Sequence, residues 1–600
     1  MLKIALATLA ITLLVGVSTS SAATTWTVTK TADTSDGTCN SDCSLREAVT
    51  AASGGDTIVV PASASPYLLT GSALVLNKSV TVVGGGARAT VLQGSAGNRV
   101  IRVTAGTTTM SGVTITGGDL TASGDGGGVV VQAGAFKLTD SAIVGNKVDI
   151  SNNNAAGGGL AVESGTSATL TRVTVAGNSV STTGPGGSTF GGGLFNSSGT
   201  LTVVDSTVAN NSNINDGTLR ARGGGVQQAS TGIAPATTLD SSTIAGNSTG
   251  GTGLGFGGNI QAEAGTVTLK NTIVAGGQTD FGPNCHSEGG TFTSSGGNVE
   301  DSPADPSESC GLGPSDRAGA DPKLSALGDF GGPTDTMALL VGSAALDAGG
   351  TCDVATDQRG VARPQGAACD SGAYEARAAV AVVSADRTTA VPGQSVRFDG
   401  SASSGEGSLS FAWNFGDGGS ASGATAGHAF SSSGHHVVTL TVTDTRGAAA
   451  SATVAVDVPD VVKPALSALA IKPSAFRAAA SGPSAAAKRH KPTVGAQVTF
   501  QLSETATVRF TAERARPGRR SGKKCVAPKA RNRHAGHCTR YVKLRGSFTR
   551  SGTPGSNHFR FAGRTGGKRL APGGYRLVAV AKDPAGNTGT AVRRAFRIVR

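Results

Sequence analysis

Six segments of the chain align on one template of nine residues. They are MSGVTITGG at Met110–Gly118, LTDSAIVGN at Leu138–Asn146, LTRVTVAGN at Leu170–Asn178, VVDSTVANN at Val203–Asn211, LDSSTIAGN at Leu239–Asn247 and LKNTIVAGG at Leu269–Gly277. A large apolar residue opens each segment, and Ile or Val follows five positions later. The openings recur every 28 to 36 residues. A repeat of this length indicates stacked units that bury their apolar faces only against neighbouring copies.

A Gly-rich step before an aliphatic residue recurs with the same period. The steps are Gly126–Val129, Gly157–Leu160, Gly191–Leu194, Gly223–Val226 and Gly257–Ile260. From the last Gly of the first four steps to the next closing Asn there are 18, 19, 18 and 22 residues. The stretch from that Asn to the next step varies in length and is rich in Ser, Thr, Asn and Gly. Each unit therefore has a constant part and one variable loop, and all the loops leave from the same side.

The segments predict strands, because they are short, rich in Val, Ile and Thr, and bounded by Gly. Stacked strands with one turn per unit predict an all-β fold that begins with a right-handed parallel β-helix. One column, Thr114, Ala142, Thr174, Thr207, Thr243 and Ile273, predicts a ladder of like residues that hydrogen-bond to one another. The closing Asn, replaced by Gly in the two outer segments, predicts a corner in the left-handed region.

The first 23 residues predict a signal peptide. Lys3 precedes an apolar run at Ile4–Val17, and small residues follow at Ser20–Ala23. The run is shorter than the ~18 residues that a membrane span needs, and no later stretch is long enough. The sequence therefore predicts a protein that is secreted, extracellular or attached to the cell surface, with no transmembrane segment after signal removal.

The eight cysteines fall into close pairs, which in an exported chain predict disulfides. The pairs are Cys39/Cys43, Cys285/Cys310, Cys352/Cys369 and Cys525/Cys538. A zinc site formed by Cys525 and Cys538 with His534 and His537 is the alternative for the last pair. The prediction for the whole chain includes no metal and no cofactor.

Charge is divided unequally along the chain. Residues 463–600 carry 30 Lys and Arg against 3 acids, whereas the preceding residues carry 21 against 36. This division predicts a basic domain with an anionic partner, such as a cell-envelope polymer or an acidic polysaccharide. The alternatives are that the basic domain lies against the acidic body of the same chain, or that its charge only keeps the protein soluble.

Residues 33–56 predict a short capping helix. Ser44 and Glu47 form a capping box, and Leu45, Ala48, Val49 and Ala52 give one apolar face that can cover the open first coil. Cys43–Ala48 spells CSLREA, and the stretch resembles the CSLREA domain found at the start of exported bacterial β-helix proteins. The repeats resemble the polymorphic outer-membrane-protein type, with Val or Ile in place of its Phe. That family includes adhesins, so the resemblance implies a surface protein.

The β-helix is predicted over 24–377. Residues 278–375 lose the period, and their motifs resemble the tail that closes this kind of β-helix, so they predict a C-terminal cap. A group of acids and arginines lies in it: Asp347, Asp357, Arg359, Arg363, Asp370 and Glu375. We interpret the group as fastening the cap, with a catalytic role as the alternative.

Residues 379–458 predict a first Ig-like sandwich. Trp413-Asn-Phe-Gly-Asp-Gly418 resembles the PKD domain, with Trp413 and Phe415 in the core and a hairpin turn at Gly416–Gly418. Residues 459–600 predict a linker followed by a second, basic Ig-like sandwich, whose last hairpin, Lys582–Asn587, resembles that of bacterial Ig-like domains. Its aromatic residues are predicted to be core rather than a base-stacking platform, since no nucleic-acid motif accompanies them. They are Phe510, Tyr541, Phe548, Phe559, Phe561 and Tyr575.

Catalytic motifs are weak in this sequence. Asp140, Arg172 and Asp205 occupy one column of the repeats and predict a ladder of opposite charges, with neighbours ~4.8 Å apart. The alternative is the acid–base row of a polysaccharide lyase. Because one Arg stands alone and no acids collect around it to bind calcium, we assign no catalytic residue.

The function that the sequence favours is that of an exported, non-catalytic surface protein for adhesion or glycan binding. The binding candidates lie in the variable loops: Asn152, Asn153, Asn154, Asp216, Arg220 and Arg222. The alternatives are a polysaccharide lyase or hydrolase of the β-helix type, and a structural envelope component without a specific ligand. The sequence does not fix the oligomeric state.

Overall fold

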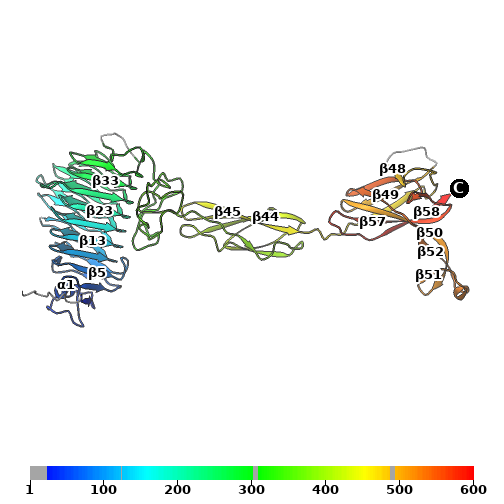
Figure 1. Cartoon of the computed structure of the whole chain (residues 1–600), viewed down its shortest axis with the longest axis horizontal. Helices are drawn as coiled ribbons and strands as arrows, with labels where there is room; N and C mark the ends of the chain where they lie inside the picture. The colour runs from blue at the N-terminus through cyan, green and yellow to red at the C-terminus, as the bar shows by residue number, and fades with distance from the viewer. Residues whose placement is uncertain (1–22, 123, 302–307, 487–493) are drawn as a thin grey trace, which may run out of the picture. The chain divides into compact units, whose positions relative to one another are not determined.

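The computed structural model describes residues 23–122, 124–301, 308–486 and 494–600. Nearly all of the predicted signal peptide, 1–23, lies outside them. The chain forms two compact units. One comprises Met1–Val380 with Ser404–Leu409 and Thr443–Ala450, and the other comprises Ala381–Ser403, Ser410–Val442 and Ser451–Arg600. The first unit contains stacked coils and the second contains β-sandwiches (Figure 1).

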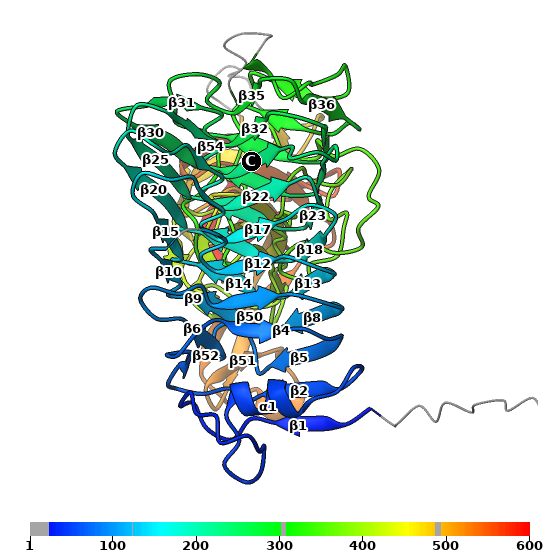
Figure 2. The same cartoon turned by 90° about the vertical axis from the view of Figure 1, so that its left-hand side faces the viewer.

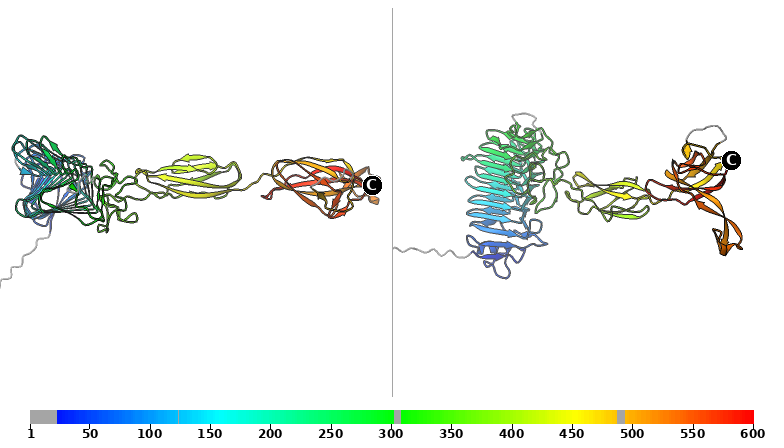
Figure 3. Two further views of the ribbon diagram at one scale, coloured as in Figure 1. Left: turned by 90° about the horizontal axis from the view of Figure 1, so that it is seen from above. Right: turned by 45° about the vertical axis from the view of Figure 1, so that its right-hand side comes forward.

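The first unit is a parallel β-solenoid, as the repeat predicted. Its coils stack along one axis (Figure 2), and Figure 3 includes a view of them end-on. Three sheets form its walls, with the following strands over the residues described. Sheet 1 contains β1 (Thr25–Thr27), β2 (Thr57–Val60), β5 (Val80–Gly84), β8 (Thr107–Ser111), β13 (Ala135–Thr139), β18 (Ser167–Thr171), β23 (Thr200–Val204), β28 (Ala236–Asp240), β33 (Thr266–Lys270) and β36 (Thr291–Ser294). Sheet 2 contains β3 (Tyr67–Leu68), β6 (Val91–Gln93), β9 (Thr114–Thr116), β14 (Ala142–Val144), β19 (Thr174–Ala176), β24 (Thr207–Ala209), β29 (Thr243–Ala245), β34 (Ile273–Ala275), β37 (Val299–Glu300) and β38 (Arg317–Ala318). Sheet 3 contains β4 (Leu74–Leu76), β7 (Ile101–Val103), β12 (Val129–Val131), β17 (Leu160–Val162), β22 (Leu194–Ser197), β27 (Val226–Ala229), β32 (Ile260–Ala262) and β35 (Cys285–Ser287).

The predicted register of the repeats is confirmed. Leu138 lies opposite Met110 and Leu170, and Leu170 lies opposite Val203. The second apolar column is also in register, since Ile143 lies between Ile115 and Val175. These side chains are fully buried in one continuous core. The aliphatic period therefore determines the solenoid, because a unit that slipped by one residue would expose its apolar set.

We predicted that the variable stretches form loops. This prediction is wrong, because they form two further parallel sheets. Sheet 4 contains β10 (Asp119–Leu120), β15 (Lys147–Asp149), β20 (Ser179–Thr183), β25 (Ser212–Asp216) and β30 (Ser248–Gly251). Sheet 5 contains β11 (Gly124–Asp125), β16 (Ala155–Ala156), β21 (Thr189–Phe190), β26 (Arg220–Arg222) and β31 (Leu254–Phe256). They enclose a small core that includes Leu120, Val148 and Val180. Stacking of the coils pairs the backbones even where the side chains are Ser and Thr.

The closing Asn residues form a buried ladder rather than left-handed corners. Asn146 Nδ2 donates to Asn178 Oδ1 at 3.0 Å, Asn178 Nδ2 donates to Asn211 Oδ1 at 2.9 Å, and Asn211 Nδ2 donates to Asn247 Oδ1 at 2.9 Å. The positive φ belongs to the residue before the closing Asn; at Asn210 it is 55°. The predicted corner is therefore wrong by one position, and the Asn side chain is left free to bridge neighbouring coils.

The ladder explains why a Gly-rich step precedes the closing Asn in each coil. A Cβ atom on Gly193 would lie 2.8 Å from the carbonyl oxygen of Gly225 and 2.9 Å from Asn211 Nδ2. The equivalent Gly159 would meet Asn178 at 3.1 Å. The last Gly of the step thus leaves room for the Asn ladder, and the two sequence landmarks are parts of one packing arrangement.

The predicted capping helix is present at the start of the solenoid. Helix α1 spans Leu45–Ala51. Its capping box is complete, since Glu47 N donates to Ser44 Oγ at 3.1 Å and Ser44 N donates to Glu47 Oε2 at 2.8 Å. Leu45, Ala48 and Val49 are buried in the same core as the coils, so the helix covers the first coil as expected.

The cysteines pair as predicted, and no cysteine in the described residues is free. Cys310 is fully buried and belongs to the solenoid core together with Cys285. Cys369 is 1% exposed and lies where the chain returns along the solenoid. The bond at Cys525 excludes the zinc alternative there in this oxidised state. The four bonds are Cys39–Cys43, Cys285–Cys310, Cys352–Cys369 and Cys525–Cys538.

The predicted C-terminal cap does more than close the end of the solenoid. Residues 320–376, the return segment, run back along the outer face of sheet 2. Gln358 Nε2 donates to Thr174 Oγ1 at 2.9 Å, and Thr207 Oγ1 donates to Gln358 Oε1 at 2.6 Å. The predicted Thr ladder is therefore wrong in its bonding: the hydroxyls of Thr174, Thr207 and Thr243 bind the return segment, and that of Thr114 donates to the carbonyl oxygen of Ala87.

The acid and arginine group fastens the return segment, as we interpreted it. Arg359 pairs with Asp357 at 2.8 Å, and Arg363 pairs with Glu375 at 2.9 Å. Glu375 also accepts from the backbone of Asp370, whose carboxylate accepts from the backbone of Asp347. All four of the ion-paired side chains are almost completely buried.

Two sandwiches follow, as predicted. The first has β39 (Ser384–Ala385), β40 (Ser395–Asp399) and β43 (Thr425–Ala429) in one sheet and β42 (Ser420–Ser422), β41 (Ser410–Asn414), β44 (Gly434–Thr443) and β45 (Ala449–Val458) in the other. Trp413 and Phe415 are 2% and 1% exposed, in agreement with their predicted core positions.

The second sandwich begins inside the stretch that we predicted to be linker-like. One sheet contains β46 (Leu466–Lys472), β49 (Ala496–Leu502), β54 (Gly555–Phe561) and β48 (Ala485–Ala486). The other contains β47 (Ala475–Arg477), β58 (Val592–Val599), β57 (Gly573–Lys582), β50 (Ala506–Ser521), β51 (Lys524–Val526), β52 (His537–Lys543) and β53 (Phe548–Gly552). A short hairpin of β55 (Arg564–Thr565) and β56 (Lys568–Arg569) and the 3-10 turn η2 (Ala530–Asn532) complete it. Of the predicted core aromatics, Tyr541 is an exception, since it is half-buried beneath Arg576.

Candidate functional site

Two columns of side chains meet where sheet 5 packs beside the outer face of sheet 3, and we call them the seam. In sheet 3 the register places Val130, Ala161, Phe195, Gln227, Gln261 and His286 in one column. In sheet 5 it places Asp125, Ala156, Phe190, Arg222, Phe256 and Phe281 in another. Figure 2 views the solenoid with sheet 3 facing the reader. With neighbouring strands ~4.8 Å apart, the seam is about 24 Å long.

Aromatic rings occupy the seam from its third coil to its last. Phe256 stacks on Phe281 with ring centroids 5.2 Å apart and contacts His286 at 5.0 Å. Phe190 contacts Phe195 at 5.7 Å. Phe281 is 42% exposed, whereas Phe195 and Phe256 are buried. The rings join the two sheets and leave one apolar face in contact with solvent.

Two arginines and one glutamate lie over these rings. The Arg220 guanidinium is 4.9 Å from the centre of Phe256, and that of Arg222 is 5.5 Å from Phe190. Glu288 pairs with both arginines; its distance to Arg222 Nε is 3.1 Å. The arginines are therefore held by charge on one side and by the ring faces on the other.

Buried amide oxygens without partners lie beside the rings. Gln227 and Gln261 are fully buried, and the side-chain oxygen of each has no hydrogen-bond partner, although Gln227 Nε2 donates to the carbonyl oxygen of Gln228 at 3.3 Å and Gln261 Nε2 to Glu288 at 3.5 Å. His286 Nδ1 has no partner either. A buried polar atom without a partner costs about 1–3 kcal/mol, and because all three are closed to solvent, a molecule bound at the surface does not reach them.

Charged residues lie at the N-terminal end of the seam. Arg102 donates to Gln132, whose Nε2 donates to Glu163 Oε1 at 3.0 Å. Burial, together with the charge of Glu163 and against that of Arg99, raises the pKa of Asp125 to about 6. A carboxyl group with a raised pKa therefore lies within the electrostatic influence of a second one at this end.

The predicted binding residues divide into two groups. Arg220 and Arg222 lie in the seam. Asn152, Asn153, Asn154 and Asp216 are exposed at the far edge of sheets 4 and 5 and do not join them. Asn154 Oδ1 accepts from the backbone of Ser188 at 2.9 Å, which is a contact between neighbouring coils.

The predicted cysteines have structural positions and do not belong to the seam. The backbone N–H of Cys310 donates to Glu300 Oε2 at 3.3 Å, inside the last coils. The carbonyl oxygen of Cys369 accepts from the backbone of Gly349 at 2.8 Å, within the return segment. Since both sulfur atoms are bonded to another cysteine, neither is available as a nucleophile or a metal ligand.

Sequence reasoning did not find the other seam residues. Phe195, Gln227 and Gln261 each follow the aliphatic residue of a Gly-rich step, so their shared position was visible in the sequence. These residues differ in type from coil to coil, however, so a search for columns of like residues does not find them. Glu288 comes from beyond the last repeat and carries no such signal.

The predicted charge ladder lies on another edge of the solenoid and is only half formed. Arg172 donates two hydrogen bonds to Asp140, at 2.7 and 2.9 Å. Asp205 is fully buried and approaches Arg363 of the return segment instead. The column is a set of corners, since Asp140, Arg172 and Asp205 have φ values of 49°, 54° and 45°.

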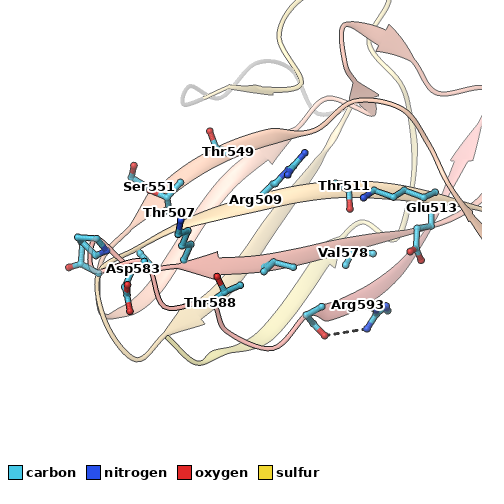
Figure 4. A pocket seen from close by; sticks show the side chains of 18 residues that line it. Thr507, Arg509, Thr511, Glu513, Thr549, Ser551, Val578, Asp583, Thr588 and Arg593 are labelled. Carbon is cyan, nitrogen blue, oxygen red and sulfur yellow. Dashed lines mark hydrogen bonds between the residues drawn. The ribbon is translucent and has the colours of Figure 1, made fainter. Parts of the chain in front are cut away.

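The second sandwich offers a basic surface. Residues 514–545, which we call the arm, carry twelve Lys and Arg and no acid. The arm consists of the far half of β50 with β51 and β52, joined by Cys525–Cys538, and extends from the sandwich (Figure 1). A hollow of about 910 Å³ on the β50–β57 face of the same sandwich is lined by Thr507, Arg509, Thr511, Lys582 and Arg593 among others (Figure 4).

Comparisons with known proteins find one family model that matches part of the chain. Residues 377–458 match the family model of the PKD domain. A search of curated proteins by sequence finds no match. No helix in the described part of the chain is long and apolar enough to cross a bilayer.

Solved structures resemble the chain only distantly. A structure of carbohydrate-binding modules from the β-sandwich superfamily is 15% identical, with 36% of this chain and 99% of that one covered and a TM-score of 0.15. The fibronectin(III)-like modules of CbhA from Clostridium thermocellum are 12% identical, with 36% and 94% covered and a TM-score of 0.15. The C-terminal domain of the antigen I/II-family protein AspA from Streptococcus pyogenes is 9% identical, with 36% and 98% covered and a TM-score of 0.12. Scores this low carry no argument about function.

Proposed function

We propose that the chain is an exported protein that binds a polysaccharide along the seam and has no catalytic activity of its own. The observation that carries this proposal is the ring of Phe281, which is 42% exposed and stacks on Phe256, together with the exposed guanidinium of Arg220 at 4.9 Å from the centre of Phe256. Sugars present hydroxyl groups at their edges and apolar C–H faces. An exposed ring next to a guanidinium donor is complementary to both.

The rest of the chain supports an extracellular setting for this role. The predicted signal peptide, the disulfides and the CSLREA resemblance at Cys43–Ala48 favour export. The PKD domain would act as a spacer. The basic second sandwich would attach the protein to an anionic envelope polymer, because a cluster of like charges attracts polyanions. Adhesion to another cell through the bound glycan is one consequence of such attachment.

Binding of the full chain to a panel of neutral and acidic polysaccharides tests the proposal. We expect retention that is weakened about tenfold or more in Phe281→Ala and in Arg220→Gln, since each removes one exposed recognising group. Asp216→Asn is the matched control, because Asp216 is exposed and lies outside the seam. Equal binding by all variants, or no binding to any polysaccharide, would contradict the proposal.

A second candidate function rests on the carboxyl groups at the N-terminal end of the seam. Glycosidases use a carboxylic acid with a raised pKa and a second carboxylate, and Asp125, whose pKa is raised, and Glu163, whose charge contributes to that rise, are the residues proposed for these roles. Release of reducing ends from a bound polysaccharide, abolished in Asp125→Asn, would establish this function in place of the non-catalytic one.

A further inference from the structure

Two of the few acids of the second sandwich lie together. Residues 463–600 contain three acids, Glu504, Glu513 and Asp583, among 30 Lys and Arg. Two of them, Glu504 and Asp583, meet Asp460, which lies in the chain between the PKD domain and the sandwich. One carboxylate oxygen from each residue lies within 4.8 Å of the others.

Each of the three acids is positioned by its own part of the chain. Asp583 follows β57, and its Oδ1 accepts from the backbone of Asn587 at 2.8 Å. Asn587 Nδ2 donates to the carbonyl oxygen of Asp460 at 2.8 Å, which holds the connecting segment against the sandwich. Glu504 lies in the turn between β49 and β50. Figure 4 shows Asp583 at one end of the hollow, with Glu513 at the opposite end.

Two of the three acids have an unpartnered carboxylate oxygen, whereas Asp460 Oδ1 accepts from the backbone of Val462 at 2.9 Å. Asp583 is 5% exposed, and its Oδ2 is buried without a hydrogen bond. Glu504 Oε1 is buried and unpartnered as well. Within the described residues, none of the three clustered acids forms an ion pair with Lys or Arg, whereas Glu513 pairs with Arg576.

Such an arrangement is unfavourable without a compensating charge. Burying a carboxylate oxygen without a donor is costly, and two more carboxylates nearby add repulsion. In a domain with so many cationic side chains, the absence of any from this cluster leaves room for a different cation.

We propose that Asp460, Glu504 and Asp583 bind a calcium ion. Calcium takes oxygen ligands at about 2.3–2.6 Å, so ligands on opposite sides of the ion lie up to about 5 Å apart. The 4.8 Å limit of this cluster fits that spacing. Magnesium requires shorter distances of about 2.0–2.1 Å and stricter geometry. Since Asp460 precedes the sandwich, the ion would fasten the connecting segment to it. This inference does not depend on the glycan-binding proposal.

Calorimetric titration of the chelator-treated full chain with calcium chloride tests the site. We expect one site with a dissociation constant of roughly 10⁻⁵–10⁻³ M, as in extracellular modules and sensors, and at least tenfold weaker binding of magnesium. Asp583→Asn should weaken calcium binding about tenfold or more. Glu513→Gln is the matched control, because it removes the third acid of the same sandwich and leaves the cluster intact.

A stability measurement separates loss of the site from loss of the fold. Glu504→Gln removes repulsion, so in chelator it should melt at the same temperature as the unchanged chain or higher, yet show no calcium-dependent rise. The unchanged chain and Glu513→Gln should both melt higher with calcium. Absence of calcium binding by the unchanged chain, or an undiminished calcium response in Asp583→Asn and Glu504→Gln, would overturn the proposal.

Discussion

Asp205 approaches Arg363 to 3.6 Å, with both side chains removed from solvent, and yet neither carboxylate oxygen of Asp205 receives a hydrogen bond. Arg363 directs its donors elsewhere, to Glu375 and to the carbonyl oxygens of Asp370 and Gly372. Burial therefore outweighs the attraction of Arg363 and raises the pKa of Asp205 to about 7. The corner of this solenoid coil thus places a carboxyl group that receives no hydrogen bond at the interface with the return segment.

Replacing Asp205 with Asn should stabilise the solenoid at pH 8 and have little effect at pH 4. The folded state holds the proton on Asp205 more tightly than the unfolded state, so the unchanged chain loses stability as the pH rises from about 4 through 7. The neutral Asn avoids this loss. We expect a gain of roughly 2–4 kcal/mol at pH 8, measured by chemical denaturation. Asn also tolerates the φ of 45° at this corner.

Asp140→Asn is the control for that comparison. Asp140 occupies the same corner with a φ of 49°, but it is half-exposed and paired with Arg172. Its replacement should cost about 0–1 kcal/mol at either pH. An equal change in the free energy of unfolding at pH 4 and at pH 8 in Asp205→Asn would show that Asp205 does not titrate in this range.

The whole solenoid should be more stable at pH 5 than at pH 8. Burial raises the pKa of Glu300 and that of Asp370 to about 7, as it does for Asp205. Because the unfolded values are near 4, protonated folded carboxyls favour the native state, and this contribution is lost as the pH rises from about 4 through 7. Scanning calorimetry across this range should show the solenoid transition moving to lower temperature. A transition that moved upward would contradict the assigned pKa values.

Removing one Asn from the buried ladder should destabilise the solenoid strongly. In Asn211→Ala, Asn178 loses an acceptor for its side chain and backbone, and the carbonyl of Val175 loses its donor. We expect a loss of roughly 2–4 kcal/mol, since several buried groups are left unpaired. Asn210→Gly, at the exposed neighbour with a φ of 55°, should change the stability little. Similar losses in the two variants would argue against the ladder.

Adding one methyl group to the Gly-rich step should be similarly harmful. Gly193 does not have a positive φ, so the cost in Gly193→Ala comes from contact with Gly225 and Asn211, and should be roughly 1–3 kcal/mol. Gly250→Ala is a suitable comparison, because a Cβ atom there meets nothing within 4 Å. It should be neutral or slightly stabilising in thermal unfolding. A tolerated Gly193→Ala would show that the ladder can move aside.

The inward-facing part of this fold could be predicted from the sequence, and much of its outer surface could not. Leu138 and Leu170 carry a strong signal because every coil needs an aliphatic residue at the same place. The bonding of Thr174 and Thr207 depends on Gln358, more than 150 residues away, and no local pattern specifies such a partner. The seam could not be predicted for the same reason, because the positions of Gln227 and Glu288 in it follow only from the stacking of the coils.

Charge on the arm should decide attachment to anionic polymers. Replacing Arg519, Arg520, Lys523 and Lys524 with Gln removes four charges from the exposed end of the arm while leaving the Cys525–Cys538 bond in place. Retention of the full chain on an anionic polysaccharide should then vanish at a lower salt concentration than for the unchanged protein, because fewer charges attract the polymer. Replacing Arg593, Arg594, Arg597 and Lys582 removes the same charge from the sandwich body and should shift the salt midpoint less. Equal shifts in the two variants would mean that the arm acts only through the net charge of the domain, and its extended shape would then need another explanation.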